Sequence, residues 1–208
     1  MNLILVGAGG HVKSCIACIE TTEHKIIGLL DIPEEIGNMI EGYPIIGSDE
    51  DIKEFNKSGT GFLVTLGQIE SSELRKKLFA RLLFLKANLP VIVSSTAFVA
   101  KTAAIDLGTI IMHKCMINSS ATIGKNCIMN TGCIIEHDCL IDDTTHVSTG
   151  AIVNGSCHIG KGCFVGSGSV IKNNITICDD VVIGAGSVVV KDINVPGIYI
   201  GNPARRIK

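Results

Sequence analysis

His137 is the residue of this sequence whose neighbours best equip it to move a proton. It lies directly between two acids, Glu136 and Asp138. An imidazole titrates near neutral pH, and a carboxylate bonded to one ring nitrogen fixes the tautomer and raises the basicity of the other nitrogen. Such a pair can take the proton from an attacking amine or hydroxyl. From the residues alone, the alternative of an ordinary surface histidine stays open.

Metal binding and covalent catalysis are the other chemistries that these residue types support in proteins. His137 and His146 are nine residues apart, which matches no zinc-ligand spacing. Only Cys15 and Cys18 form a C-x-x-C pair, and no second pair completes a four-ligand site. No serine or cysteine is evidently paired with His137, so an acyl-enzyme has no support. We therefore expect neither a metal nor a covalent intermediate.

Composition excludes several classes of function. The 208 residues carry a formal net charge of −2, which leaves no basic excess to neutralise the phosphates of a nucleic acid. No apolar stretch approaches the roughly 18 residues of a spanning helix, so no membrane insertion is expected. The first residues run straight into an apolar segment without the basic lead of a signal peptide. These features favour a cytoplasmic protein.

A repeat of six residues runs through the C-terminal half and must position His137. Every sixth residue from Val99 to Val189 is aliphatic, and all sixteen except Met129 are β-branched. A period of six fits neither a helix nor an alternating strand, but it fits short extended segments with a bend every six residues. Three such segments make a triangular coil of eighteen residues, whose strands stack at about 4.8 Å. The pattern predicts a parallel β-solenoid of roughly five coils.

The fifth position of each hexad explains most of the cysteines. Six of the nine occupy it, namely Cys115, Cys127, Cys133, Cys139, Cys157 and Cys163. Most other residues at this position are small, as a crowded corner requires, and a buried cysteine acts there as a small hydrophobe. We expect packing residues rather than disulfides, because nothing indicates secretion.

The residues before the repeat predict a small α/β unit. A strand at 2–6 leads into Gly7-Ala8-Gly9-Gly10-His11 and a helix to about Glu20, and a second strand ends at Asp31. This order is Rossmann-like, although Val12 stands where the dinucleotide fingerprint and the P-loop both need glycine. A glycine turn before a helix still offers free N–H groups to a phosphate. A packing turn that binds nothing remains the alternative.

Together the two halves resemble one family over nearly the whole chain. The resemblance rests on the glycine turn at 7–11, Asp31, Asn130-Thr131, Glu136-His137-Asp138 and the Gly-Asn-Pro-Ala-Arg ending at 201–205. These segments are similar to those of the bacterial nucleotide-aminosugar N-acetyltransferases of the bacillosamine and perosamine type, grouped with sialic acid O-acetyltransferases. The resemblance implies a Rossmann-like nucleotide-sugar-binding domain at 1–94. It also implies a left-handed β-helix acetyltransferase domain of hexapeptide repeats at 95–208, with a short C-terminal tail.

The resemblance implies roles for single residues as well. His137 would be the general base, tuned by Asp138 rather than by Glu136. Acetyl-CoA would contact His146, Gly155, Ser167 and Ala185, with the Gly155 N–H facing the thioester carbonyl. The sugar nucleotide would contact Gly9, Gly10, His11, Asp31 and Gly67.

Two stacked glycine-rich turns are the expected path of CoA along the solenoid. Residues 166–169 and 184–187 read Gly-Ser-Gly-Ser and Gly-Ala-Gly-Ser, eighteen residues apart. Missing side chains there would leave a bare strip for a long thin ligand. The alternative is that these glycines only serve tight corners.

The implied activity is direct transfer of acetyl from acetyl-CoA to the 4-amino group of a nucleotide-linked deoxyaminosugar, for bacterial surface glycans or glycoproteins. A homotrimer with sites shared between subunits is implied too. A hydroxyl acceptor on a sialic-acid-like sugar is the alternative, ahead of a purely structural solenoid or a carbonic-anhydrase-like protein. Ile32 and Gln68 depart from the bacillosamine-type pattern, which has an acid and an asparagine there. The nucleotide and the sugar therefore stay open.

Overall fold

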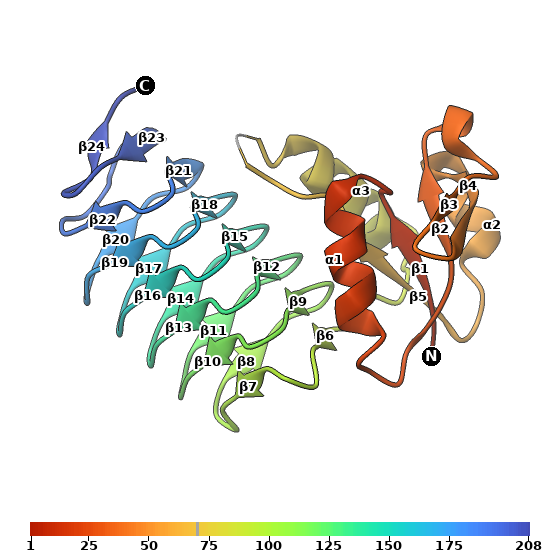
Figure 1. Ribbon diagram of the computed structural model, residues 1–208, viewed down its shortest axis with the longest axis horizontal. Coiled ribbons are helices and arrows are strands. Elements are labelled where there is room, and N and C mark those ends of the chain that lie inside the picture. The colour runs from red at the N-terminus through yellow and green to blue at the C-terminus, as the bar shows by residue number, and fades with distance from the viewer. Residues whose placement is uncertain (70) are drawn as a thin grey trace.

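The structure is a computed structural model that describes residues 1–69 and 71–208. An α/β domain is followed by a solenoid of stacked short strands (Figure 1). The α/β domain contains, in order, β1 (Asn2–Val6), α1 (Gly10–Ile19), β2 (Lys25–Asp31), a 3-10 turn (Pro33–Glu35), β3 (Met39–Ile40), β4 (Tyr43–Ser48), a second 3-10 turn (Asp49–Asp51), α2 (Ile52–Phe55), β5 (Thr60–Val64) and α3 (Glu73–Phe84).

The first sheet has the strand order β3-β4-β2-β1-β5 and is parallel apart from the β3–β4 hairpin. β1 and β5 are continuous apolar runs that are buried almost throughout, as expected of parallel strands with both faces covered. No element was expected between 32 and 60, where β3, β4 and α2 lie. β3 and α2 have only two and four residues, and β4 contains a proline and a glycine, Pro44 and Gly47, which weaken the strand pattern.

The solenoid consists of three parallel sheets. One contains β6 (Ile92–Val93), β9 (Ile110–Ile111), β12 (Ile128–Met129), β15 (His146–Val147), β18 (Phe164–Val165) and β21 (Val181–Ile183), and is extended by β23 (Gly197–Ile200) and the antiparallel β24 (Arg205–Arg206). The second contains β7 (Phe98–Val99), β10 (Met116–Ile117), β13 (Ile134–Ile135), β16 (Ile152–Val153), β19 (Val170–Ile171) and β22 (Val188–Val189). The third contains β8 (Ala104–Ile105), β11 (Thr122–Ile123), β14 (Leu140–Ile141), β17 (His158–Ile159) and β20 (Thr176–Ile177).

The strand register confirms the eighteen-residue coil. Ile117 pairs with Ile135, and Ile135 pairs with Val153, so that residues eighteen apart lie on neighbouring strands. All three of these side chains are completely buried in the solenoid interior. The six cysteines at the fifth hexad position are also buried, and their thiols are free. They pack the corners as expected.

α1 joins the two parts of the molecule. Figure 1 shows it beside the β6–β9 end of the solenoid. Its buried side chains belong to the same apolar cluster as Ile92 and Ile110, and the Cys18 thiol lies 3.7 Å from the carbonyl oxygen of Ile111. Cys15 is buried in this cluster too, so the C-x-x-C pair packs against the solenoid. None of the described helices is long and apolar enough to cross a membrane.

Candidate active site

His137 and Asp138 lie in the turn between β13 and β14, at one edge of the triangular coil. The His137 Nδ1 and the Asp138 Oδ2 are 2.8 Å apart, and both side chains are more than half exposed. Asp138 adopts a left-handed φ of 60°, as do residues such as Ser120 and Ser156 at the same place in other solenoid turns. The hydrogen bond to Asp138 raises the pKa of His137, and the charges of Asp138 and Glu136 act in the same direction. Among the described residues only Nδ1 of the ring has a hydrogen-bond partner, so Nε2 is left as the basic atom.

Gly155 lies one coil above His137, against its ring. A Cβ at this position would lie 2.7 Å from Cε1 and Nε2 of His137, so any side chain would displace the imidazole. The His137 carbonyl accepts a hydrogen bond from the Ser156 N–H, which fixes the two turns relative to each other. Within the described ranges, the Gly155 N–H has no acceptor. An unsatisfied donor beside the basic nitrogen is what an oxyanion in this place requires.

A cavity of about 530 Å³ lies at the junction of the α/β domain and the solenoid. It brings together residues predicted for the sugar nucleotide with residues predicted for acetyl-CoA. Its lining comprises Gly9, Gly10, His11, Leu66, Gly67, Gln68, Ile69, Asn130, His146, Ser148, Phe164 and Ser167. The α1 N-terminus opens into it, because Gly9 caps the helix without a side chain and neither Gly9 nor Gly10 has an atom within 4 Å of where a Cβ would be.

His146 is buried in the wall of this cavity rather than exposed at a corner. Its Nδ1 is 2.8 Å from the carbonyl oxygen of Gln68, and its Nε2 is 3.1 Å from Nδ2 of Asn130. A carbonyl only accepts, so Nδ1 carries the proton and Nε2 accepts from the amide. Burial lowers the pKa of His146 to about 3, and the charges of His11 and Arg75 add to this effect. His146 is therefore a neutral ring of fixed tautomer.

His11 faces the same cavity from α1, with its ring centroid 6.1 Å from that of His146. Burial and the charge of Arg75 lower its pKa to about 4, so this ring is also neutral at pH 7. Its Nε2 is buried and has no partner among the described residues. A ligand in the cavity can satisfy this atom.

Asp31 lies in a separate hollow of about 130 Å³, on the other side of Leu66. Its Oδ2 accepts a hydrogen bond of 3.1 Å from the Ala8 N–H, which ties the end of β2 to the glycine turn. Asp49 also lines this hollow, and the remaining walls are mainly apolar.

The glycine-rich turns of the solenoid have two different causes. A Cβ on Gly166 would lie 2.6 Å from the Ala185 nitrogen, and a Cβ on Gly184 would lie 2.6 Å from the Ile200 side chain, so close packing demands both glycines. Gly168 and Gly186 have positive φ and open space around them. The turns are thus tight corners, and only their second glycines leave bare surface beside Ser167 and Ala185.

Within one chain the structure brings together some of the predicted site residues and keeps the others apart, with Asp31 in its own hollow and Ala185 outside both hollows. Gly9, Gly10, His11, Gly67, His146 and Ser167 share the junction cavity. The turn of His137, Asp138 and Gly155 joins the second sheet to the third, whereas His146 lies on the first. Among the described residues, no three His, Cys, Asp or Glu side chains are grouped closely enough to hold a metal ion.

Comparisons with known proteins agree with this architecture. A family model for the PglD N-terminal domain matches residues 2–82, and one for the bacterial transferase hexapeptide, with six repeats, matches residues 156–191. Among solved structures, the acetyltransferase domain of PglB from Neisseria gonorrhoeae, in complex with acetyl coenzyme A, is 28% identical with a TM-score of 0.89, covering 99% of this chain and 98% of that chain.

Two further structures extend over all of this chain. One is a mutant of perosamine N-acetyltransferase from Caulobacter crescentus, in complex with CoA and GDP-perosamine. It is 24% identical with a TM-score of 0.92, and the match covers 97% of its own length. The other is WeeI from Acinetobacter baumannii AYE, which is 23% identical with a TM-score of 0.87. The match covers 100% of its length as well. No curated protein matches.

The chain is an acyltransferase whose residues 2–82 match the PglD N-terminal domain and whose residues 156–191 match the bacterial transferase hexapeptide. The resemblance and the fold that the sequence predicted, a Rossmann-like unit followed by a left-handed β-helix, are confirmed. The matched PglD segment contains the glycine turn, Asp31 and Gly67, and the matched hexapeptide segment contains Ser167 and Ala185. His137 and His146 lie between the two segments.

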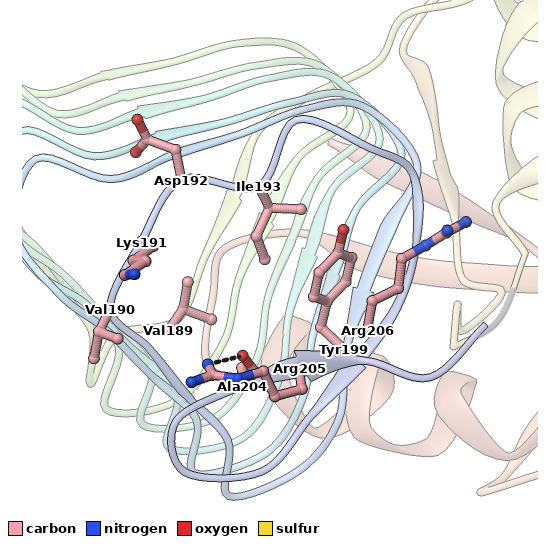
Figure 2. A pocket seen from close by; sticks show the side chains of 9 residues that line it. All are labelled: Val189, Val190, Lys191, Asp192, Ile193, Tyr199, Ala204, Arg205 and Arg206. Carbon is pink, nitrogen blue, oxygen red and sulfur yellow. Dashed lines mark hydrogen bonds between the residues drawn. The ribbon is translucent and has the colours of Figure 1, made fainter.

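A second hollow of about 370 Å³ opens at the C-terminal end of this transferase's solenoid. Figure 2 shows Val189, Ile193 and Tyr199 around it, while Arg206 extends away. The last strands β23 and β24 border this hollow. It contains none of the predicted site residues.

Three residues near His146 had no role in the site predicted from the sequence. Asn130 carried part of the family resemblance, but its bond to His146 depends on the stacking of β15 on β12. Gln68 was noted only as a departure from the family pattern. Arg75 looks like an ordinary polar residue of an amphipathic helix, yet it is 2% exposed.

Proposed function

We propose that this protein transfers the acetyl group of acetyl-CoA to the 4-amino group of a nucleotide-linked deoxyaminosugar, for bacterial surface glycans or glycoproteins. The observation that carries the proposal is the His137–Asp138 pair lying against Gly155, a base beside an unused N–H donor. The nature of the substrates is supported by structural relatives that bind CoA with GDP-perosamine, or acetyl-CoA.

The reaction proceeds by direct transfer. Nε2 of His137 takes a proton from the sugar amine as the nitrogen attacks the acetyl carbonyl, while Asp138 holds Nδ1–H and stabilises the imidazolium. The Gly155 N–H donates to the developing oxyanion. The tetrahedral intermediate collapses, the C–S bond breaks, and the CoA thiolate is protonated by the imidazolium. Amide and free thiol are the products.

The glycine turn before α1 supplies the site for the diphosphate of the sugar nucleotide. Gly9 and Gly10 expose backbone N–H groups at the positive end of the helix, and no acid lies in its first turn. His11 offers its free Nε2 from the same turn. A Cβ on Gly67 would lie 3.3 Å from the Cβ of His11, so the glycine keeps this approach open. Asp31 accepts hydrogen bonds from the nucleoside in the neighbouring hollow.

Acetyl-CoA lies along the corner that begins at His146. The turns of Ser167 and Ala185 stack on one another, since the Gly186 N–H donates to the Ser167 carbonyl. Backbone amides and the exposed glycines at this corner contact the pantetheine arm. Neutral His146 contacts the acyl end through its ring and not through charge.

A homotrimer completes the site. The outward residues of the β7–β22 sheet are all apolar and incompletely buried: Phe98, Met116, Ile134, Ile152, Val170 and Val188. The corresponding row of the third sheet is mixed, because Thr122, His158 and Thr176 alternate there with Ala104 and Leu140. An apolar row of this length favours contact with further copies of the chain. Shared sites bring the His137 turn of one copy to the cavity of another.

The deciding experiment measures CoA-thiol release from acetyl-CoA with UDP-, dTDP- and GDP-linked 4-aminosugars. We expect release with one aminosugar and a loss of at least about a hundredfold in kcat for His137→Ala, because a general base contributes 10²–10⁴. The matched control is His158→Ala, which removes a second half-exposed histidine paired with a carboxylate, Asp142, at 2.8 Å. This control should retain wild-type turnover.

The outcomes separate the alternatives. Near wild-type turnover in folded His137→Ala contradicts the base assignment. No release with any aminosugar from folded wild type contradicts the amine acceptor, and sialic acids then test a hydroxyl acceptor. An O-acetyl product is released by mild alkali, whereas an amide is stable.

A further inference from the structure

Arg75 of α3 is a buried cation that joins the α/β domain to the solenoid. Its Nη1 donates to the carbonyls of Val64 and Leu66 at 2.8 and 2.9 Å, and its Nε and Nη2 both donate to the carbonyl of Asn126 at 3.1 Å. Val64 and Leu66 belong to the end of β5 and the loop after it, whereas Asn126 lies in a solenoid turn. One guanidinium thus clamps two backbone segments that are about sixty residues apart.

The buried guanidinium of Arg75 carries a desolvation cost in the free energy of folding. Burying a guanidinium removes its hydration, and carbonyl dipoles replace this only in part. The ion pairs formed by the described residues do not include Arg75. A leucine or methionine would fill the space between domains without this cost, so packing alone does not account for an arginine here.

The clamped segment leads directly to His146. Gln68 follows Leu66 by two residues, and its carbonyl oxygen accepts the hydrogen bond from Nδ1–H of His146. The Gln68 side chain is also anchored, because Nε2 donates to the carbonyls of Gly162 and Cys163 at 3.0 and 3.1 Å. Two side chains therefore hold this segment in place: Arg75 binds its beginning, and the Gln68 amide ties its end to the solenoid. The Gln68 carbonyl has little freedom to move away from the imidazole.

We propose that Arg75 is a positioning residue of the transferase site: by clamping the Val64 and Leu66 carbonyls to Asn126, it holds the Gln68 carbonyl against His146 and fixes the Nδ1–H tautomer of that ring. The catalytic consequence rests on the proposed function, in which His146 contacts acetyl-CoA. The positioning itself does not, since it concerns the protein alone.

The charge of Arg75 supports the same arrangement. It lowers the pKa of His146 and of His11, in addition to the larger effect of burial. Both rings therefore face the cavity as neutral hydrogen-bonding groups. A free histidine prefers the Nε2–H tautomer, so the Nδ1–H form at His146 is one that its surroundings must impose.

The test uses three folded variants of the full chain and the ¹⁵N chemical shifts of the His146 ring at pH 7, without substrates. Arg75→Lys keeps the charge but loses the fork that spans three carbonyls. Gln68→Ala releases the same segment without altering a buried charge. Lys76→Gln is the matched control, because it removes the ion pair between α3 and Asp180 at 3.0 Å, another bridge to the solenoid, while leaving the clamp intact.

In wild type and Lys76→Gln we expect the ¹⁵N shifts of His146 to show the Nδ1–H tautomer alone. In Arg75→Lys and Gln68→Ala we expect a fraction of the Nε2–H tautomer as well. With substrates, both variants should raise the KM for acetyl-CoA by about tenfold with a smaller change in kcat, as for lost positioning of a bound group. If Arg75→Lys does not fold, Gln68→Ala decides.

An unchanged tautomer in the folded variants overturns the proposal, and so does an equal shift in Lys76→Gln, which would show general loosening of the two domains. Failure of the proposed function looks different. Wild type would then release no thiol with any acceptor, although its His146 signature could still respond to Arg75→Lys.

Discussion

At the scale of single residues, the two important histidines are opposites. His137 is exposed, and a neighbouring carboxylate raises its pKa, whereas His146 is buried with a pKa of about 3. His146 is therefore neutral, whereas His137 is open to solvent beside its carboxylate. The contrast supports the proposal that His137 transfers the proton and that His146 makes neutral contacts, since environment separates the roles of like groups.

The pH profile of Asp138→Asn tests this division. A general base works only when unprotonated, so kcat/KM rises with pH through the pKa of His137. Asp138 raises that pKa, and its removal should shift the acidic limb of the profile to lower pH while reducing the maximal rate. The measurement is kcat/KM against pH for both proteins. A limb that stays in place would show that another group titrates.

At the scale of elements, the solenoid depends on its inward row. Ile135 is completely buried on β13 between Ile117 and Val153. Each coil contributes only a few such side chains, so every one of them supports the stacking of its neighbours. The outward side chains of the third sheet have no comparable role in the fold.

Ile135→Ala should therefore destabilise the protein by about 2–5 kcal/mol, from lost burial and a cavity that a stacked strand cannot collapse. Chemical denaturation monitored by circular dichroism measures this. Thr176→Ala, on the exposed outward row of β20, should change the stability by less than about 0.5 kcal/mol. Equal effects of the two substitutions would contradict the assignment of the core.

At the scale of the whole molecule, the apolar outward row of the second sheet sets the proposed assembly. Phe98 and Met116 are 56% and 40% exposed, which is unusual for residues of their size in adjacent strands of an open face. The first sheet has a similar apolar row, but there Ile92, Ile110 and Ile128 are fully buried beside the α/β domain. The second sheet has no such cover within the chain that the structure describes.

Met116→Glu should dissociate the assembly, because it places a charge in the apolar contact. Analytical ultracentrifugation should show trimer for wild type and monomer for the variant, with transferase activity lost in parallel. Thr122→Glu puts the same charge on the exposed neighbouring face and should remain trimeric. A monomeric wild type, or an active monomeric Met116→Glu, would contradict the shared-site proposal.

The sequence by itself determined the solenoid, the burial of its cysteines and the pairing of His137 with an adjacent acid. These features are local or periodic: a repeat of six fixes which residues stack eighteen apart, and Asp138 is next to His137 in the chain. β3 could not be predicted, since its two residues show no period, and Pro44 and Gly47 weaken the strand pattern of β4.

Only the tertiary structure decided what surrounds His146. Its place in the hexad favoured a solvent-facing corner, and only the family resemblance implied a contact to acetyl-CoA. The docking of the α/β domain buries it under Gln68. Arg75 lies about fifty residues from the Asn126 carbonyl that it binds. Such contacts depend on how two separately patterned domains pack, and no periodicity within either domain contains that information.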